Sequence, residues 1–165
     1  RLERMFRVNV TGSFVCAREA VRRMSTKHGG HGGIIVNLSS AAARLGSPGQ
    51  YVDYAAAKGA IDVFTLGLAK EVGAEGIRVN AVRPGLIETG MTKPVFDNAK
   101  QRGTDHKIGQ LNPLKRAGQP HELATMGLFL LSDEASYVNG QAIAVDGGLS
   151  SSHPVTKQEY GRTAV

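Results

Sequence analysis

The sequence has 165 residues, 41% of them hydrophobic and 21% charged, which fits one globular domain or a piece of one and excludes a disordered or fibrous chain. A single cysteine excludes an internal disulfide framework, and no apolar run approaches the length of a membrane span. Most of the net charge of +6 lies in residues 1–32, where arginines follow helical spacing opposite an apolar stripe, so a solvated helix face is favoured over a nucleic-acid interface.

The first half of the chain predicts a helix, a strand and a second helix. Apolar residues at steps of three and four predict a helix over residues 6–24, ending before the glycines at 29 and 30. Residues 34–38 predict a short strand, buried on both faces because its apolar residues do not alternate. A loop of small residues follows, and the second helix is expected from about Tyr51 to Val72.

The second half repeats this alternation. Strands are expected over residues 77–82 and 142–145, and a helix over residues 120–131. Residues 83–119 are expected to be irregular and partly helical, and residues 150–165 to form a polar tail. Alternating helices and strands predict an α/β fold, a doubly wound parallel sheet that binds its ligands at the carboxyl ends of the strands.

Tyr54 and Lys58 lie four residues apart, which places a phenol and an ammonium one turn apart on one face of the second helix. A neighbouring ammonium favours the phenolate, so a tyrosine in this setting is suited to acid–base catalysis near neutral pH. The motif alone is weak, and an incidental surface pair is the alternative interpretation. Its context strengthens it, because the hydroxyls of Ser39 and Ser40 follow a buried strand and a Pro84-Gly85 turn follows the next.

Six motifs follow one another in this order: residues 8–12 (VNVTG), 35–40 (IVNLSS), 54–58 (YAAAK), 78–85 (RVNAVRPG), 112–116 (NPLKR) and 137–148 (YVNGQAIAVDGG). Together they resemble the carboxyl-terminal two-thirds of a classical short-chain dehydrogenase/reductase, the family that includes 3-oxoacyl-carrier-protein reductases and glucose 1-dehydrogenases. The resemblance implies a Rossmann-like fold over residues 1–149, NAD or NADP as cofactor, and oxidoreduction of a carbonyl or a secondary alcohol.

The resemblance also implies catalytic roles. Tyr54 would be the general acid or base, and Lys58 would assist it and bind the nicotinamide ribose. Ser40 would polarise the substrate carbonyl, and Asn9 would complete a proton relay through a water in a bend of the first helix. The interval from Ser40 to Tyr54 is one residue longer than is usual in the family, so Ser39 remains an alternative. The alternative interpretations are that Ser39 and Ser40 carry ordinary loop hydroxyls and that Asn9 has a purely structural role.

The strand that ends near residue 82 leads into the expected cofactor contacts. By the resemblance, Ile87 and Thr89, with Pro84 and Gly85, would seat the nicotinamide carboxamide, although Thr89 also suits a helix cap. Residues 91 to about 111 would form a lid over the substrate. The five histidines show no ligand spacing, and no metal site is expected.

The glycine-rich phosphate turn of a dinucleotide fold is absent from this sequence, so the choice between NAD and NADP is not encoded here. The dense glycine cluster at residues 29–33 follows a helix and precedes a strand, the wrong order for a phosphate cradle. Two hypotheses therefore stand: part of an active oxidoreductase, or a catalytically inactive fragment that serves as an interaction or assembly unit. A small-molecule substrate, a cytoplasmic location and a homo-oligomer, in the family usually a tetramer, are expected, with neither nucleic acid nor membrane as partner.

Overall fold

Three short apolar segments form a parallel sheet in the order β1-β2-β3. The computed structural model describes residues 1–151, and the predicted tail lies almost wholly outside them. In the register, Ile35 lies opposite Val79 and Ala81 lies opposite Ala142. The predicted doubly wound parallel sheet is confirmed; its strands are β1 Gly33–Leu38, β2 Ile77–Pro84 and β3 Ala142–Val145.

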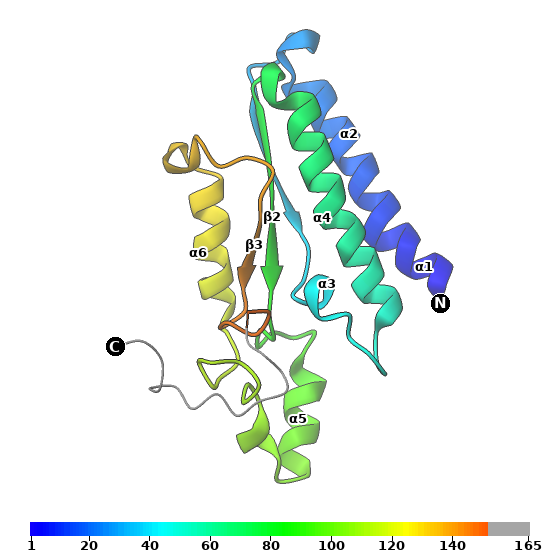
Figure 1. Ribbon diagram of the computed structural model, residues 1–165, viewed down its shortest axis with the longest axis vertical. Helices are drawn as coiled ribbons and strands as arrows, with labels where there is room; N and C mark the ends of the chain where they lie inside the picture. Colours follow the sequence, from blue (N-terminus) through cyan, green and yellow to red (C-terminus); the bar gives the residue numbers. More distant parts are fainter. Residues whose placement is uncertain (152–165) are drawn as a thin grey trace.

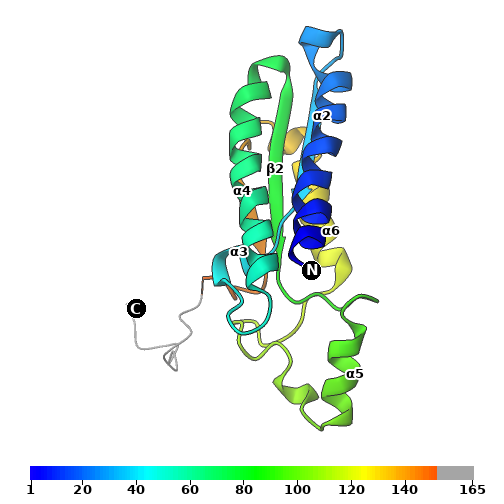
Figure 2. The same ribbon diagram turned by 90° about the vertical axis from the view of Figure 1, so that its right-hand side faces the viewer.

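Helices cover both faces of this sheet. Figures 1 and 2 together show α2 and α4 side by side on one face and α6 on the other. Among residues 1–151, no helix is both long and apolar enough to cross a membrane. The α-helices are α1 Leu2–Phe6, α2 Gly12–Met24, α3 Ala42–Leu45, α4 Val52–Val72, α5 Lys93–Gln101 and α6 Pro120–Leu130. Short 3-10 turns are η2 Thr26–His28, η3 Gly73–Glu75, η4 Asp105–Lys107 and η5 Asp133–Ala135.

The first predicted helix is continuous but changes its winding. Between α1 and α2 the chain makes a π-helical turn, η1 Arg7–Thr11, which packs against α4. Such turns insert one residue into the ladder of hydrogen bonds and occur often at functional sites. This turn contains Asn9, around which the family resemblance implies a bend.

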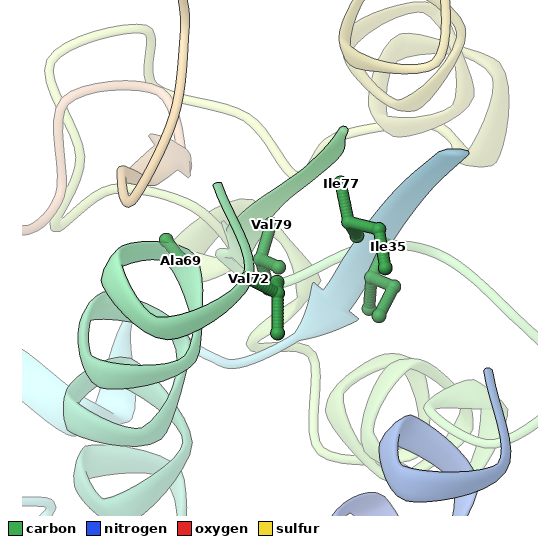
Figure 3. Packing of buried hydrophobic residues seen from close by; sticks show 5 residues of the cluster. All are labelled: Ile35, Ala69, Val72, Ile77 and Val79. Carbon is green, nitrogen blue, oxygen red and sulfur yellow. The ribbon is translucent and has the colours of Figure 1, made fainter. Parts of the chain in front are cut away.

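The main core lies between the sheet and the helices α2 and α4. Figure 3 shows Ala69 and Val72 of α4 facing Val79 of β2, with Ile35 and Ile77 beside them. Ile77 and Val79 are 1% and 0% exposed. Burying a side chain of this size stabilises the fold by about 1.5–3 kcal/mol. A second cluster on the opposite face joins Val82 to Leu130 of α6.

Several polar residues of the ordered motifs hold the strands rather than a ligand. The Arg78 guanidinium donates to the carbonyls of Leu130, Val138 and Ser132, at the carboxyl end of α6 and in the segment after it. The Asn139 side chain accepts from the Val79 amide and donates to the Ala69 carbonyl. These contacts bind β2, α4 and the segment before β3 into one unit.

One sequence expectation was wrong. The β1 strand was expected to be buried on both faces, yet only Ile35 is buried and Leu38 is 58% exposed. Its apolar run is left partly open because β1 is an edge strand, paired only with β2 among the described residues. The first helix ends at Met24, before the glycines as predicted, and left-handed Gly29 closes the following turn η2.

Candidate active site

The loop after β1 and the end of β2 are joined edge to edge. The Ser39 amide donates to the Val82 carbonyl at 2.8 Å, and the Ala41 amide donates to the Pro84 carbonyl at 2.9 Å. Because the strands are parallel, these contacts bring both loops to the same carboxyl edge of the sheet. The predicted serine and Pro-Gly segments therefore lie next to each other.

Tyr54 and Lys58 reach this edge from the first turns of α4. Lys58 is only 8% exposed, and its ammonium donates to the Leu38 carbonyl at 2.8 Å. The Lys58 Nζ atom lies 5.6 Å from the centre of the Tyr54 ring. Burial lowers the pKa of Lys58, and the Asp62 carboxylate opposes that shift by raising it.

The Tyr54 hydroxyl has no hydrogen-bond partner among residues 1–151, whereas its backbone amide donates to Asp53 Oδ1 at 3.0 Å. The side chain is half-buried, so the phenol is held near the lysine with its polar end free. An ammonium carries three N–H groups, and only one acceptor of Lys58 lies within the described chain. The pair therefore has donors to offer to a bound molecule.

The two serines differ in their surroundings. Ser39 is 2% exposed, and its hydroxyl donates to the Lys58 carbonyl at 3.2 Å. Ser40 is half-buried, and its hydroxyl accepts from the Ala42 amide at 3.1 Å. The Ser39 hydroxyl is buried against α4 by this hydrogen bond, which favours Ser40 as the serine that can contact a substrate.

Asn9 occupies the centre of the π-helical turn η1. Its side-chain amide donates to the Met5 carbonyl at 3.1 Å, and its own carbonyl accepts from the Ser13 hydroxyl. The structure thus places Asn9 on the element that packs against α4.

The segment after β2 is folded back on itself. Ile87 is 8% exposed and pairs with Gly118, while the Thr89 amide donates to the Thr92 hydroxyl. A cavity of 210 Å³ lies beside Ile87, bounded also by Asp146, and it does not include Tyr54 or Lys58. One wall is the Arg116–Glu122 ion pair, and hydrogen bonds from Arg116 lower the pKa of Glu122 to about 2.

Gly85 is expected to help seat the nicotinamide carboxamide, and in the structure its neighbour is Asp146. A Cβ atom added at Gly85 would meet Cα and Cβ of Asp146 at 2.8 Å. The glycine is therefore required by the close approach of the chain after β3.

The glycine cluster at residues 29–33 lies at the opposite, amino end of the strands. A Cβ atom at Gly30 would lie 2.4 Å from the backbone of Met24, and one at Gly32 would lie 2.5 Å from the Gly76 carbonyl oxygen. The chain's own backbone fills the space that a phosphate would need. Among residues 1–151, this glycine cluster therefore offers no cradle for a phosphate.

The predicted lid lies beyond the arrowheads of β2 and β3 in Figure 1 and contains the short helix α5. Its two ends carry apolar side chains that are open to solvent, Met91 at 92% and Leu111 at 85% exposure. Among residues 1–151, no three His, Cys, Asp or Glu side chains are grouped so that they could hold a metal ion.

Sequence reasoning missed one polar pair at this site. Asp62 follows Lys58 by one further turn of α4, and Arg83 at the end of β2 forms an ion pair with it at 2.9 Å. The four-residue spacing from Lys58 was the available signal.

Comparison with known proteins identifies relatives of this arrangement. Residues 1–150 match the protein family described as enoyl-(acyl carrier protein) reductase. The chain is 53% identical over 148 residues to the Escherichia coli protein named uncharacterized oxidoreductase YgfF, a match that covers 90% of this chain and 58% of that protein. The chain spans about half the length of the curated relatives it matches.

Solved structures share the same architecture. A gluconate 5-dehydrogenase from Burkholderia cenocepacia, in complex with NADP and tartrate, superposes with a TM-score of 0.83 at 33% identity. That match covers 92% of this chain and 57% of the other. A 4-hydroxyisoleucine dehydrogenase mutant complexed with NADH and succinate gives 0.81 at 28% identity, covering 92% of this chain and 60% of the other.

Proposed function

The chain belongs to the short-chain dehydrogenase/reductase family, and from this premise we propose that its complete polypeptide interconverts a carbonyl compound and a secondary alcohol by NAD(P)-dependent hydride transfer. The observation that carries the proposal is the pairing of Tyr54 and Lys58. A buried ammonium stands beside a half-buried phenol whose hydroxyl has no partner in the described part of the chain, at the carboxyl edge where parallel sheets bind ligands.

In the reducing direction, the Ser40 hydroxyl donates a hydrogen bond to the carbonyl oxygen and polarises the C=O bond. The substrate carbon gains a hydride, and the oxygen takes its proton from the Tyr54 hydroxyl. In the oxidising direction the Tyr54 phenolate removes the alcohol proton. Each direction needs the phenol and the phenolate to interconvert readily.

Lys58 supports that interconversion because its ammonium, 5.6 Å from the centre of the Tyr54 ring, favours the phenolate. Its remaining N–H groups are suited to the ribose hydroxyls of the cofactor. Asn9, on the turn that packs against α4, is proposed to return a proton to this site through water.

The chemistry supplied by a nicotinamide cofactor, when bound, is donation or acceptance of hydride. In this chain Lys58, Ile87, Thr89 and the Pro84-Gly85 turn would hold its nicotinamide end. Related structures in complex with NADH and with NADP support a nicotinamide dinucleotide.

Replacing Tyr54 by Phe tests the proposal in the complete natural polypeptide. We expect turnover of NADH or NADPH with a panel of ketones and alcohols to fall by about 10²–10⁴-fold, because the variant has no proton to transfer. Cofactor binding, followed by nicotinamide fluorescence, should largely remain. Tyr137→Phe is the matched control, since Tyr137 is fully exposed and lies two residues after η5, far along the chain from Tyr54. Turnover that survives in Tyr54→Phe would overturn the role of Tyr54.

A second candidate, an assembly unit without catalysis, is favoured by the open edge of the sheet. The groove between α2 and β1 is lined by small residues of α2, among them Gly12, Ser13 and Cys16, and by the largely apolar residues 34–38 of β1, and it suits a packed partner. Intact-mass measurement of the natural protein separates the two candidates. A mass near 17.5 kDa would support the assembly unit, and a clearly larger mass would exclude it.

A homo-oligomer is the expected assembly. The outer faces of α2 and α4 carry Phe14, Val15, Val63 and Leu66, each at least 44% exposed. Light scattering on the complete polypeptide tests this expectation.

A further inference from the structure

Asp62 continues the row that Tyr54 and Lys58 begin. The three residues follow one another at intervals of four along α4, so they lie on neighbouring turns of one helix face. The row runs from the exposed start of the helix toward its packed middle.

The Asp62 carboxylate is held on one side only. Its Oδ2 atom accepts from Nε of Arg83 at 2.9 Å and lies 2.9 Å from the Arg83 Nη2 atom. Its Oδ1 atom is buried and has no hydrogen-bond partner among the described residues. Arg83 is itself anchored, because its Nη1 atom donates to the Ala142 carbonyl on β3 at 3.0 Å.

This ion pair is a poor candidate for a purely stabilising contact. The two side chains are only 17% and 13% exposed, and removing charges from water at such a place offsets much of their attraction. An unpaired carboxylate oxygen adds to that penalty. A role in the neighbouring site explains why the pair is placed here.

We propose that Asp62 and Arg83 form a positioning unit for Lys58, in which the free side of the carboxylate keeps the buried ammonium charged and Arg83 limits that attraction. The inference rests on the proposed function, because the charge of Lys58 matters through Tyr54. Asp62 and Arg83 are positioning residues, which act through Lys58 and not by contact with substrate or cofactor.

The charges around Lys58 support the assignment. Burial lowers the pKa of Lys58, and Asp62 is the group that raises it. Tyr54 on α4 and the Leu38 carbonyl on β1 complete its surroundings. Other charged side chains on elements packed against this part of α4 are exposed: Glu3 and Arg4 of α1, Arg7 of η1 and Arg44 of α3.

Two substitutions should shift the pKa of Lys58 in opposite directions. Asp62→Asn removes the attracting charge and leaves Arg83 nearby, so the pKa of Lys58 should fall. Arg83→Gln keeps a hydrogen-bond donor to Asp62 but removes the competing charge, so the pKa of Lys58 should rise. A merely structural pair would give the same direction in both variants, or no change.

The first measurement needs no cofactor. The complete polypeptide is labelled with ¹³C-lysine, Lys58 is assigned with Lys58→Arg, and its signal is titrated by NMR in each variant. Glu75→Gln is the matched control, since it removes a paired carboxylate at the other end of the sheet and should leave Lys58 unchanged. Equal Lys58 titrations in wild type, Asp62→Asn and Arg83→Gln would overturn the inference. If Asp62→Asn does not fold, the rise in Arg83→Gln decides the question.

The second measurement is the pH profile of alcohol oxidation. In Asp62→Asn the rate should begin to rise at a higher pH than in wild type, with kcat/KM at pH 7 lower on the order of tenfold, the effect of one nearby charge on a buried group. An unmoved profile in active Asp62→Asn would overturn the inference. Absence of turnover in wild type would instead refute the proposed function, and the NMR titration would still judge the inference.

Discussion

Each end of the sheet holds a carboxylate and an ammonium, and the two ends differ in how fully these groups are paired. At the amino end, the Glu75 carboxylate accepts from the Ser25 hydroxyl and from the Lys27 ammonium, so both of its oxygens are paired. At the carboxyl end, one Asp62 oxygen has no partner within residues 1–151, and the ammonium of Lys58 is buried. Glu75 lies in the 3-10 turn η3 and Asp62 lies in α4, and the two carboxylates differ in how completely their oxygens are paired.

That difference separates groups that hold the fold from groups that are available for chemistry. Hydrogen bonds from Lys27 and Ser25 lower the pKa of Glu75 below its ordinary 4.5, so it contributes stability above that pH and loses it as the pH falls through the folded value. The pKa of Lys58 is lowered by burial, so its charged form opposes folding at neutral pH. Polar groups kept at a cost to stability are typical of functional sites.

The largest expected effect is that of Lys58→Met, which should abolish most of the activity at the carboxyl end of the sheet. In the complete polypeptide, turnover is expected to fall by about 10²–10⁴-fold because the phenolate loses its cation. The free energy of unfolding should change by less than about 1 kcal/mol, since the lost hydrogen bond to Leu38 is offset by relief from burying a charge. Parallel kinetic assays and urea unfolding check this, and a large loss of stability would contradict the comparison.

Gly32→Ala should destabilise the amino end of the sheet. Gly32 has a φ of 81°, and the added Cβ would lie 2.5 Å from the Gly76 carbonyl oxygen, so we expect a loss of about 2–4 kcal/mol in unfolding free energy. Gly29→Ala is the matched control, because Gly29 has a φ of 82° with nothing within 4 Å, and should lose only about 1–2 kcal/mol. Urea unfolding measures both, and equal losses would show that the close approach to Gly76 is unimportant.

Ser25→Ala should have the smallest effect and sharpen the contrast. Ser25 is 0% exposed, and losing its hydroxyl leaves a buried acceptor with one partner fewer, for an expected loss of about 1–3 kcal/mol in unfolding free energy. Turnover of the folded variant should equal that of wild type, because the site lies at the other end of the strands. Reduced turnover at unchanged stability would refute a purely structural role for this end.

Much of the fold followed from local patterns. The bounds predicted for α4, β2 and α6 differ from those in the structure by two residues or fewer, because apolar periodicity, the left-handed Gly76 and Pro120 act within a few residues. The burial of β1 was mistaken, since an apolar run predicts a strand and does not say whether neighbours cover it.

The candidate site was predictable only where its residues share one element. The approach of Tyr54 to Lys58 follows from helical spacing, but the choice between Ser39 and Ser40 depends on which side chain turns toward α4. The Asp62–Arg83 pair joins a helix to a strand twenty-one residues later, and no local pattern relates the two.

By itself, the sequence determined the parallel α/β alternation, the family motifs and the Tyr54–Lys58 spacing, because each depends on contacts within one helix or strand. Only the tertiary structure decided that the glycines at 30 and 32 serve backbone packing and that Gly85 makes room for Asp146. It also decided that burial lowers the pKa of Lys58 while the Asp62 carboxylate raises it. The physical reason is that close approach and burial are set by segments distant along the chain, which meet only when the sheet has formed.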